Sequence, residues 1–228
     1  MTAIVPFANR EDAGSRLAER LRGLSLSRPL VLAIPRGGIE VGAPLARALG
    51  AELDVVLSRK LGAPDQPELA LGAVSETGEM YLDRGPYALS EAVLRYLEAE
   101  RVRQTAEIER RLRVFRAVRP KADIAGRSVI VTDDGIATGS TMIAALTTVR
   151  AQQPRELIVA VPVAPRTRLE ELRPLCQRRV CLCVPADFWS VGQFYRDFHE
   201  ISDERVVELL RGLDRSYRAR REEPWTRA

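Results

Sequence analysis

The sequence is short of the residues that cross-link a protein or hold a metal. It has three cysteines and one histidine, His199, which excludes a disulfide framework and disfavours a cysteine–histidine zinc site. Cys176, Cys181 and Cys183 cannot all pair, and we expect inert thiols, the last two in a buried strand over 180–184. No window approaches the roughly 20 apolar residues of a membrane span. We therefore expect a soluble, cytoplasmic protein with no membrane partner.

Lysine and aromatic residues are also scarce. Lys60 and Lys121 are the only lysines among 35 basic residues, and 5% of the residues are aromatic. Against 31 acidic residues the net charge is +4, which suits an anionic ligand but is too small for a dedicated nucleic-acid-binding protein. We therefore single out Lys60, a rare lysine predicted to lie in a polar loop, as a candidate functional residue.

Apolar runs, glycine loops and helical spacing alternate along the chain. A capped helix is predicted from Asn9 to about residue 23. Strands are predicted over 30–34, 53–57, 127–132, 157–163 and 180–184. Apolar runs without strict alternation, separated by helices, indicate a parallel sheet that is covered on both faces. The predicted fold is α/β, a doubly wound parallel sheet flanked by helices.

The chain is expected to form a single domain over residues 1–228. Its core is placed at about 25–185, because the predicted strands fall there. A small hood is expected from residues 185–210 with part of the N-terminus. Residues 224–228 are expected to fray.

Residues 90–118 lack glycine and proline and predict a long helix. Its arginines stand four residues after glutamates, as in Glu91 with Arg95. That spacing favours a solvated, self-paired face over a nucleic-acid-binding face. Nucleic acid is therefore not an expected partner.

The segment from Val129 to Thr141 carries the most specific chemistry. A strand there leads into Asp133 and Asp134 and then into a loop of small residues that opens a helix. Such a loop presents unpaired backbone N–H groups to a phosphate, and its hydroxyls can add donors. The two acids can accept hydrogen bonds from a diol one sugar length away. This spacing describes a site for a 5-phosphorylated ribose.

The same segment resembles the phosphoribosyl pyrophosphate (PRPP) motif of type I phosphoribosyltransferases, with a plain strand-turn-helix as the alternative. The resemblance implies that Asp133 and Asp134 hold the ribose hydroxyls and meet Mg²⁺ mainly through water, and that Asp134 takes part in catalysis. It implies that the 5-phosphate lies in a loop made of Ala137, Thr138, Gly139, Ser140 and Thr141. Gly135 departs from the family's usual apolar residue, which should affect packing more than binding.

Two shorter segments resemble the family's contacts to the leaving pyrophosphate. Arg36, Gly37 and Gly38 follow the first predicted strand and match the pyrophosphate loop, which the family often holds in a strained, sometimes cis, peptide. Arg59 and Lys60 follow the second and match the basic residues that neutralise pyrophosphate, which makes both catalytic candidates. Residues 61–76 then stand in place of a mobile catalytic loop. A glycine turn and an exposed basic turn are the structural alternatives.

Two signals disagree about the acceptor. The segment 185–197 is similar to the hypoxanthine-guanine branch, which implies that Phe188 and Trp189 meet the acceptor base and Arg196 the pyrophosphate. A hydrophobic hood explains the aromatics equally well. Ala137 is more typical of the adenine branch, because the 6-oxopurine branch usually has a proton-handling aspartate there. We give Ala137 more weight, so hypoxanthine and guanine are not expected acceptors.

The resemblance as a whole implies an enzyme of nucleotide salvage that uses PRPP and Mg²⁺. It would move 5-phosphoribose to a nitrogen of a nucleobase or similar acceptor and release pyrophosphate, and the family often forms homodimers. The alternative is a PRPP-sensing regulatory protein without turnover. Arg59 and Lys60 favour the enzyme, since a sensor need not keep positive charge at a leaving group. A third hypothesis is a site for another phosphorylated metabolite.

Overall fold

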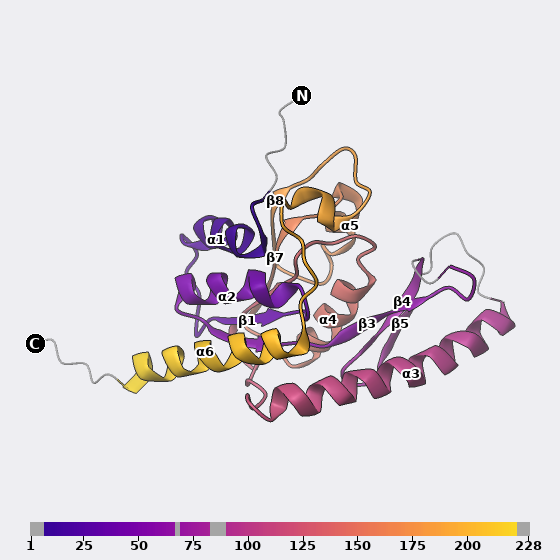
Figure 1. Ribbon diagram of the computed structural model, residues 1–228, viewed down its shortest axis with the longest axis horizontal. Coiled ribbons are helices and arrows are strands. Elements are labelled where there is room, and N and C mark those ends of the chain that lie inside the picture. The colour runs from indigo at the N-terminus through magenta and orange to yellow at the C-terminus, as the bar shows by residue number, and fades with distance from the viewer. Residues whose placement is uncertain (1–6, 67–68, 83–89, 223–228) are drawn as a thin grey trace, which may run out of the picture.

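The central feature of the computed structural model, which describes residues 7–66, 69–82 and 90–222, is a five-stranded parallel sheet (Figure 1). The strands, in spatial order, are β2 (Glu52–Val55), β1 (Leu30–Ala33), β6 (Ser128–Thr132), β7 (Glu156–Val163) and β8 (Arg178–Cys183). All neighbouring strands pair in parallel. Every residue of β1 and β6 is buried, as expected for strands covered on both faces. The predicted doubly wound α/β fold is confirmed.

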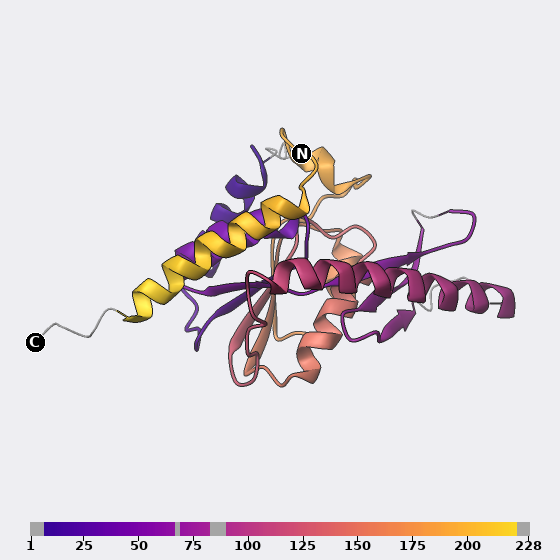
Figure 2. The ribbon, with the colours of Figure 1, turned by 60° about the horizontal axis from the view of Figure 1, so that its bottom comes forward.

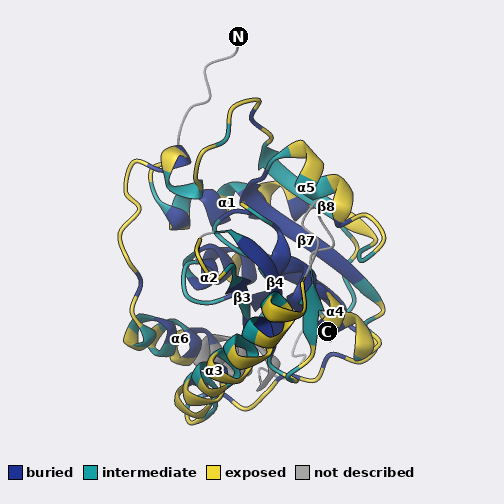
Figure 3. Ribbon diagram, turned by 90° about the vertical axis from the view of Figure 1, so that its right-hand side faces the viewer, coloured by how far each residue is buried: buried dark blue, intermediate teal, exposed yellow. Residues whose placement is uncertain are grey.

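Helices cover both faces of this sheet. One face carries α1 (Arg10–Leu21), α2 (Gly38–Leu49) and α6 (Asp203–Glu222), and the other carries α4 (Ser140–Ala151) and α5 (Arg166–Glu171). Alternate residues of β1 show this division, because Val31 packs with the first group and Leu32 with the second. Figure 3 shows the buried strands enclosed by helices whose outer faces are exposed. The carboxyl ends of the strands are left for the loops.

A second, antiparallel sheet corrects the expectation that Lys60 lies in a loop. It consists of β3 (Ser58–Gly62), β4 (Ala70–Ser75) and β5 (Met80–Leu82), so Arg59 and Lys60 lie on a strand, and the segment expected as a mobile loop is largely a hairpin. Its apolar residues, such as Leu61 and Val74, complete a core with the long helix α3 (Glu91–Arg116). Figures 1 and 2 both show this sheet and α3 extending away from the central sheet.

The predicted helices are present, with one addition. Asn9 caps α1 by accepting a hydrogen bond from the Asp12 N–H at 2.9 Å, and Ser90 caps α3. The unpredicted helix is α6, in the arginine-rich C-terminal segment. Its buried residues Val206, Leu210 and Leu213 recur at helical spacing, a signal that was available in the sequence. In the described part of the chain, no helix combines the length and apolar character needed to span a membrane.

Strand β8 is less buried than its sequence suggested. It lies at the edge of the sheet with a single neighbouring strand, and Cys181 and Cys183 are only partly buried. Burial still raises the pKa of the Cys181 thiol to about 11 and also raises the pKa of Cys183. Both thiols therefore stay protonated at neutral pH, which makes them poor nucleophiles.

The segment expected to form a hood packs against the start of the chain. Phe7 donates its N–H to the Phe194 carbonyl at 2.8 Å and accepts from the Arg196 N–H at 2.9 Å. The short helix η1 (Val191–Phe194) belongs to this segment. Residues 203–210, which are also expected in the hood, instead form the start of α6. The expected fraying of 224–228 falls outside the described residues.

The close packing of α1 on α2 gives a test of this arrangement. A Cβ at Gly14 would lie 2.3 Å from the backbone oxygen of Val41, whereas one at Gly23 would meet nothing within 4 Å. Alanine favours a helix over glycine by roughly 0.5–1 kcal/mol, but overpacking costs about 1–3 kcal/mol. We expect Gly14→Ala to lower the free energy of unfolding in urea and Gly23→Ala to leave it the same or slightly higher. Equal stability of both variants would contradict the packing.

Candidate active site

The sheet brings the two glycine-containing motifs together. β1 and β6 are adjacent, with Ala33 paired to Thr132, and the Ile34 N–H donates to the Thr132 carbonyl at 2.9 Å. The segments that follow these strands therefore meet at the carboxyl edge of the sheet. From β1 the chain turns to β2 on one side, while β6 lies on the other, which is the switch point where open α/β sheets bind ligands.

The glycine loop lies directly against the acidic pair. A Cβ at Gly37 would lie 1.9 Å from Oδ2 of Asp134, so the close approach requires glycine. The peptide bond between Pro35 and Arg36 is cis, a geometry that the family resemblance allowed for. Arg36 is paired with the exposed Glu200. The backbone of this loop therefore forms one wall around the acids.

The small-residue loop opens α4 as expected. Gly139 is the N-cap, with a left-handed φ of 87° that favours glycine, and no side chain caps the helix. Beyond it is a cavity of about 220 Å³. Residues that line it include Lys60, Asp133, Ala137, Thr138, Gly139 and Thr141. Predicted residues from two separate segments of the chain therefore meet in one cavity at a helix N-terminus, whereas Ser140 is buried in the first turn.

The second sheet presents Lys60 to this cavity and turns Arg59 away. Ser58 anchors β3 by donating its hydroxyl to the Thr141 carbonyl at 2.8 Å. Successive side chains of a strand point to opposite faces, so Lys60 lies on the side of Ser58. Arg59 instead donates to the side chain of Gln104 on α3. Burial, followed by the charge of Arg111, lowers the pKa of Arg59.

The two acids have different surroundings. Asp133 lines the cavity, whereas Asp134 forms an ion pair with Arg10, whose Nε lies 2.8 Å from its Oδ2. Burial raises the pKa of both carboxyls, and for Asp133 the charge of Asp134 adds to the effect. Arg10 partly opposes the shift at Asp134. Negative charge at Asp133 is thus costly unless a cation or hydrogen-bond donors are brought by a ligand.

Sequence reasoning missed Arg10, which is the first residue of α1 and only 5% exposed. A signal was present, because a cation in the first turn of a helix opposes the helix dipole. Such a residue needs a compensating partner elsewhere in the fold. Its partner is 124 positions away in the sequence, which no local pattern reveals.

The aromatic residues assigned to the acceptor do not line this cavity. Phe188 stacks on Phe194 with ring centroids 5.6 Å apart, and Trp189 is 89% exposed. The residue of this segment that does line the cavity is Val191, another that sequence reasoning missed. It also explains Gly135, because a Cβ there would lie 2.7 Å from Val191 Cγ1. Arg196 is exposed, beyond the lining residues.

The acids fit a magnesium ion that arrives with a phosphate ligand. Among the described residues, no three histidine, cysteine or acidic side chains gather to hold a metal by themselves. Mg²⁺ is commonly held by one or two carboxylates together with water and substrate phosphates. Asp133 and Asp134 supply hard oxygen donors of this kind beside the cavity.

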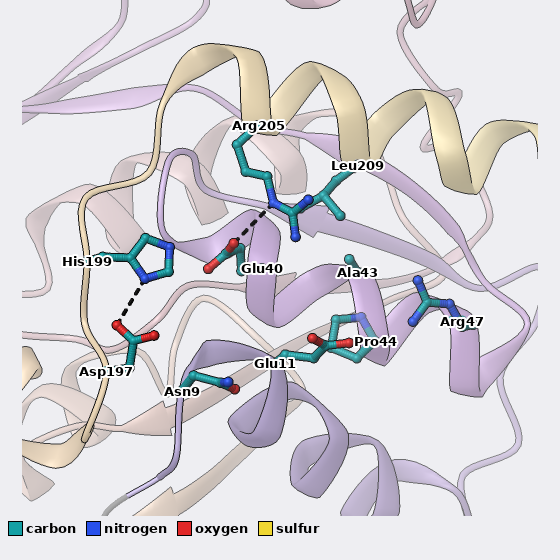
Figure 4. Close-up of a pocket in the computed structure, with 10 residues that line it drawn as sticks. All are labelled: Asn9, Glu11, Glu40, Ala43, Pro44, Arg47, Asp197, His199, Arg205 and Leu209. Carbon is teal, nitrogen blue, oxygen red and sulfur yellow. Dashed lines mark hydrogen bonds and ion pairs between the residues drawn. The ribbon is translucent and has the colours of Figure 1, made fainter.

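A larger cavity of about 510 Å³ lies between α1, α2 and α6 (Figure 4). None of the residues expected to bind PRPP lines it. Two internal contacts occupy its wall. Arg205 Nε forms an ion pair with Glu40 at 3.2 Å, and His199 Nδ1 lies within hydrogen-bonding distance of Asp197 Oδ1, at 3.0 Å. Cavity volume alone therefore does not identify the candidate site. The smaller cavity is the one lined by residues that are expected to bind PRPP.

The burial of Asp133 predicts a pH-dependent gain of stability on substitution. The pKa of Asp133 in the folded state is raised above the ordinary 3.8. Asp133 therefore lowers the free energy of unfolding as the pH rises from 3.8 to the raised pKa, and it has no such effect below 3.8. Asp133→Asn removes this effect. We expect the variant to be more stable than the wild type at pH 7, with the gain vanishing as the pH falls to 4.

Urea unfolding between pH 4 and 8 measures this difference, with Asp65→Asn as an exposed surface control. A variant that is less stable than the wild type at pH 7 would show that the carboxylate is already compensated in the free protein.

Comparisons with known proteins agree with the family resemblance of the sequence. A family model described as a phosphoribosyl transferase domain matches residues 2–199. Two curated relatives from Mycobacterium tuberculosis strains CDC 1551 and H37Rv, each named a "putative phosphoribosyl transferase", are 41% identical over 216 residues. The match covers 93% of this chain and 47% of each relative, so the chain spans about half the length of the curated relatives it matches.

A solved structure is also similar. The crystal structure of TT1426 from Thermus thermophilus is 49% identical, with a TM-score of 0.77, over 91% of this chain and 98% of that chain. The family model covers most of the chain and includes both glycine loops, Lys60 and the acidic pair. On this evidence the chain belongs to the phosphoribosyl transferase domain family.

Proposed function

We propose that the 220 Å³ cavity binds PRPP and that the protein transfers its 5-phosphoribose to a nitrogen of a small acceptor, releasing pyrophosphate. The observation that carries this proposal is the meeting of Asp133, Lys60 and the loop 137–141 at the N-terminus of α4. An acid for a diol, a cation for a leaving group and free N–H groups for a phosphate are the three contacts that PRPP requires. Family membership supports the same conclusion.

The ribose 5-phosphate end has the simplest assignment. The uncapped N-terminus of α4 carries a partial positive charge and unpaired N–H groups, which suit a phosphate. The hydroxyls of Thr138 and Thr141 can add donors. Asp133 then accepts hydrogen bonds from the ribose hydroxyls. This binding fixes the anomeric carbon with respect to the glycine loop.

The pyrophosphate end depends on cations. Negative charge grows on the leaving group as the bond to the anomeric carbon breaks, so preorganised positive charge lowers the barrier. Lys60 supplies it from β3. Arg36 forms an exposed pair with Glu200, worth at most about 1 kcal/mol, and can exchange this partner for pyrophosphate. Mg²⁺, when bound, would neutralise the phosphate oxygens. Arg59 contributes positive charge near the pyrophosphate without contacting it. Arg196 would have to move before it could contact the pyrophosphate.

Binding is tested by thermal unfolding with PRPP and Mg²⁺, compared with ribose 5-phosphate, pyrophosphate and nucleotides. A ligand of the folded state raises the midpoint with concentration, by about 2.7 kcal/mol of stability at 100 times Kd. We expect the largest rise with PRPP and Mg²⁺, and none in the double variant Asp133→Asn/Asp134→Asn. An undiminished rise in that variant would place the ligand elsewhere.

The acceptor is predicted from Ala137, which stands at the loop position expected to serve the base. An alanine side chain cannot donate or accept a proton, whereas transfer to a 6-oxopurine needs a general acid or base at a ring nitrogen. We therefore expect pyrophosphate release from PRPP with some other base or amine, and little or none with hypoxanthine or guanine.

An assay of pyrophosphate release over purines, pyrimidines and orotate measures this, with Ala137→Asp as the gain-of-function variant. Efficient turnover of guanine by the wild-type protein would refute the prediction. PRPP binding without turnover of any acceptor would favour the sensing alternative.

A further inference from the structure

The acidic pair is asymmetric, and this asymmetry has a structural cause. We propose that Arg10 is a positioning residue that holds Asp134 away from the ligand, so that Asp133 is the carboxylate that meets the ribose. The inference rests on the proposed PRPP site and assigns the two acids of that site to different tasks. It gives the N-terminal helix a part in the reaction that the motif alone does not contain.

Arg10 has three partners, which come from two other parts of the chain. Its Nε lies 2.8 Å from Asp134 Oδ2, and its Nη1 donates to the His199 carbonyl at 2.8 Å. Its guanidinium carbon lies 3.8 Å from the centroid of the Phe198 ring, which is a cation–π contact. With 5% of the side chain exposed, Arg10 is fixed rather than solvated. A planar, always charged group with a fixed fork of donors suits such a junction.

Asp134 is held through its backbone as well. The Tyr195 hydroxyl donates to the Asp134 carbonyl at 2.5 Å, and the side chain of Asp134 lies against the backbone of Gly37. Tyr195, Gly37 and Arg10 are not among the residues that line the cavity. The carboxylate is therefore part of the joint between α1, the glycine loop and the segment 195–199.

Asp133 has the opposite environment. Its one described hydrogen bond comes from the neighbouring N–H of Asp134, at 2.8 Å, and its side chain lines the cavity with Lys60. Arg10 cancels the charge of Asp134, so the pair presents about one negative charge to the ligand instead of two. A diol or a hydrated cation is then drawn to Asp133, while Asp134 keeps the loop in place.

Charge-balanced variants separate this account from equal sharing. Arg10→Met leaves a buried carboxylate unpaired, and Asp134→Asn leaves a buried guanidinium unpaired. The double variant Arg10→Met/Asp134→Asn removes both charges together. We expect each single change to weaken PRPP binding about tenfold or more, as a loss of positioning. The double variant should recover most of this loss and most of the thermal midpoint in the absence of ligand.

The matched control is Arg10→Met/Asp133→Asn, in which binding should stay lost because the acid that meets the ribose is gone. Titration calorimetry with PRPP and Mg²⁺ gives the dissociation constants, and thermal unfolding without ligand gives the midpoints. If Arg10→Met does not fold, Arg10→Lys keeps the charge with fewer donors and should bind more weakly than the wild type and more tightly than Asp133→Asn.

The outcomes are distinguishable. Wild-type protein that does not bind PRPP overturns the proposed function itself. Wild-type protein that binds, with a double variant as weak as Asp134→Asn alone, overturns the assignment of Arg10, because Asp134 would then contact the ribose directly. Recovery in the double variant, but not in the control, supports it.

Discussion

The contact between the Asp134 carboxylate and the Gly37 backbone, closed from the other side by Arg10, is the constraint on which the candidate site depends. It joins the loops after β1 and β6 so closely that a side chain at residue 37 would displace the Asp134 carboxylate. A buried ion pair loses several kcal/mol of solvation, and removing one partner typically costs about 3–5 kcal/mol. The Arg10–Asp134 ion pair therefore fixes the loops after β1 and β6 in one arrangement, and this arrangement sets the position of the cavity wall.

The rest of the molecule supports this joint from several directions. The α1–α2 contact at Gly14 sets the position of Arg10 at the start of α1. The pairing of Phe7 with Phe194 and Arg196 holds the segment whose Tyr195 hydroxyl donates to the Asp134 carbonyl. The second sheet is anchored by Ser58 to the first turn of α4, which places Lys60 beside the small-residue loop 137–141. The acids, the cation and the N–H groups are thus held by elements that belong to separate layers.

Much of the fold and of the candidate site was predictable from the sequence, because these features depend on local sequence patterns. The apolar runs gave the parallel sheet, Asn9 the start of α1, and the run from Asp133 to Thr141 a specific motif. The rest depends on tertiary contacts. Arg10 pairs with an acid that lies far along the chain. Strand β3 is too short to show the alternation typical of a strand in the sequence, and its place in the fold depends on the packing of Leu61 against α3. The aromatic pair 188–189 was the most visible feature of its segment, yet the smaller Val191 lines the cavity.

The central claim is that residues 137–141 form the cradle for the phosphate of a phosphoribosyl ligand. Titration of ¹⁵N-labelled protein with ribose 5-phosphate, followed by amide chemical shifts, tests it without any acceptor or turnover. The account predicts that the largest shifts fall on the amides of residues 137–141, with smaller shifts at Asp133. Shifts centred instead on the larger cavity, at Glu40, His199 and Arg205, or no saturable shift at all, would contradict it.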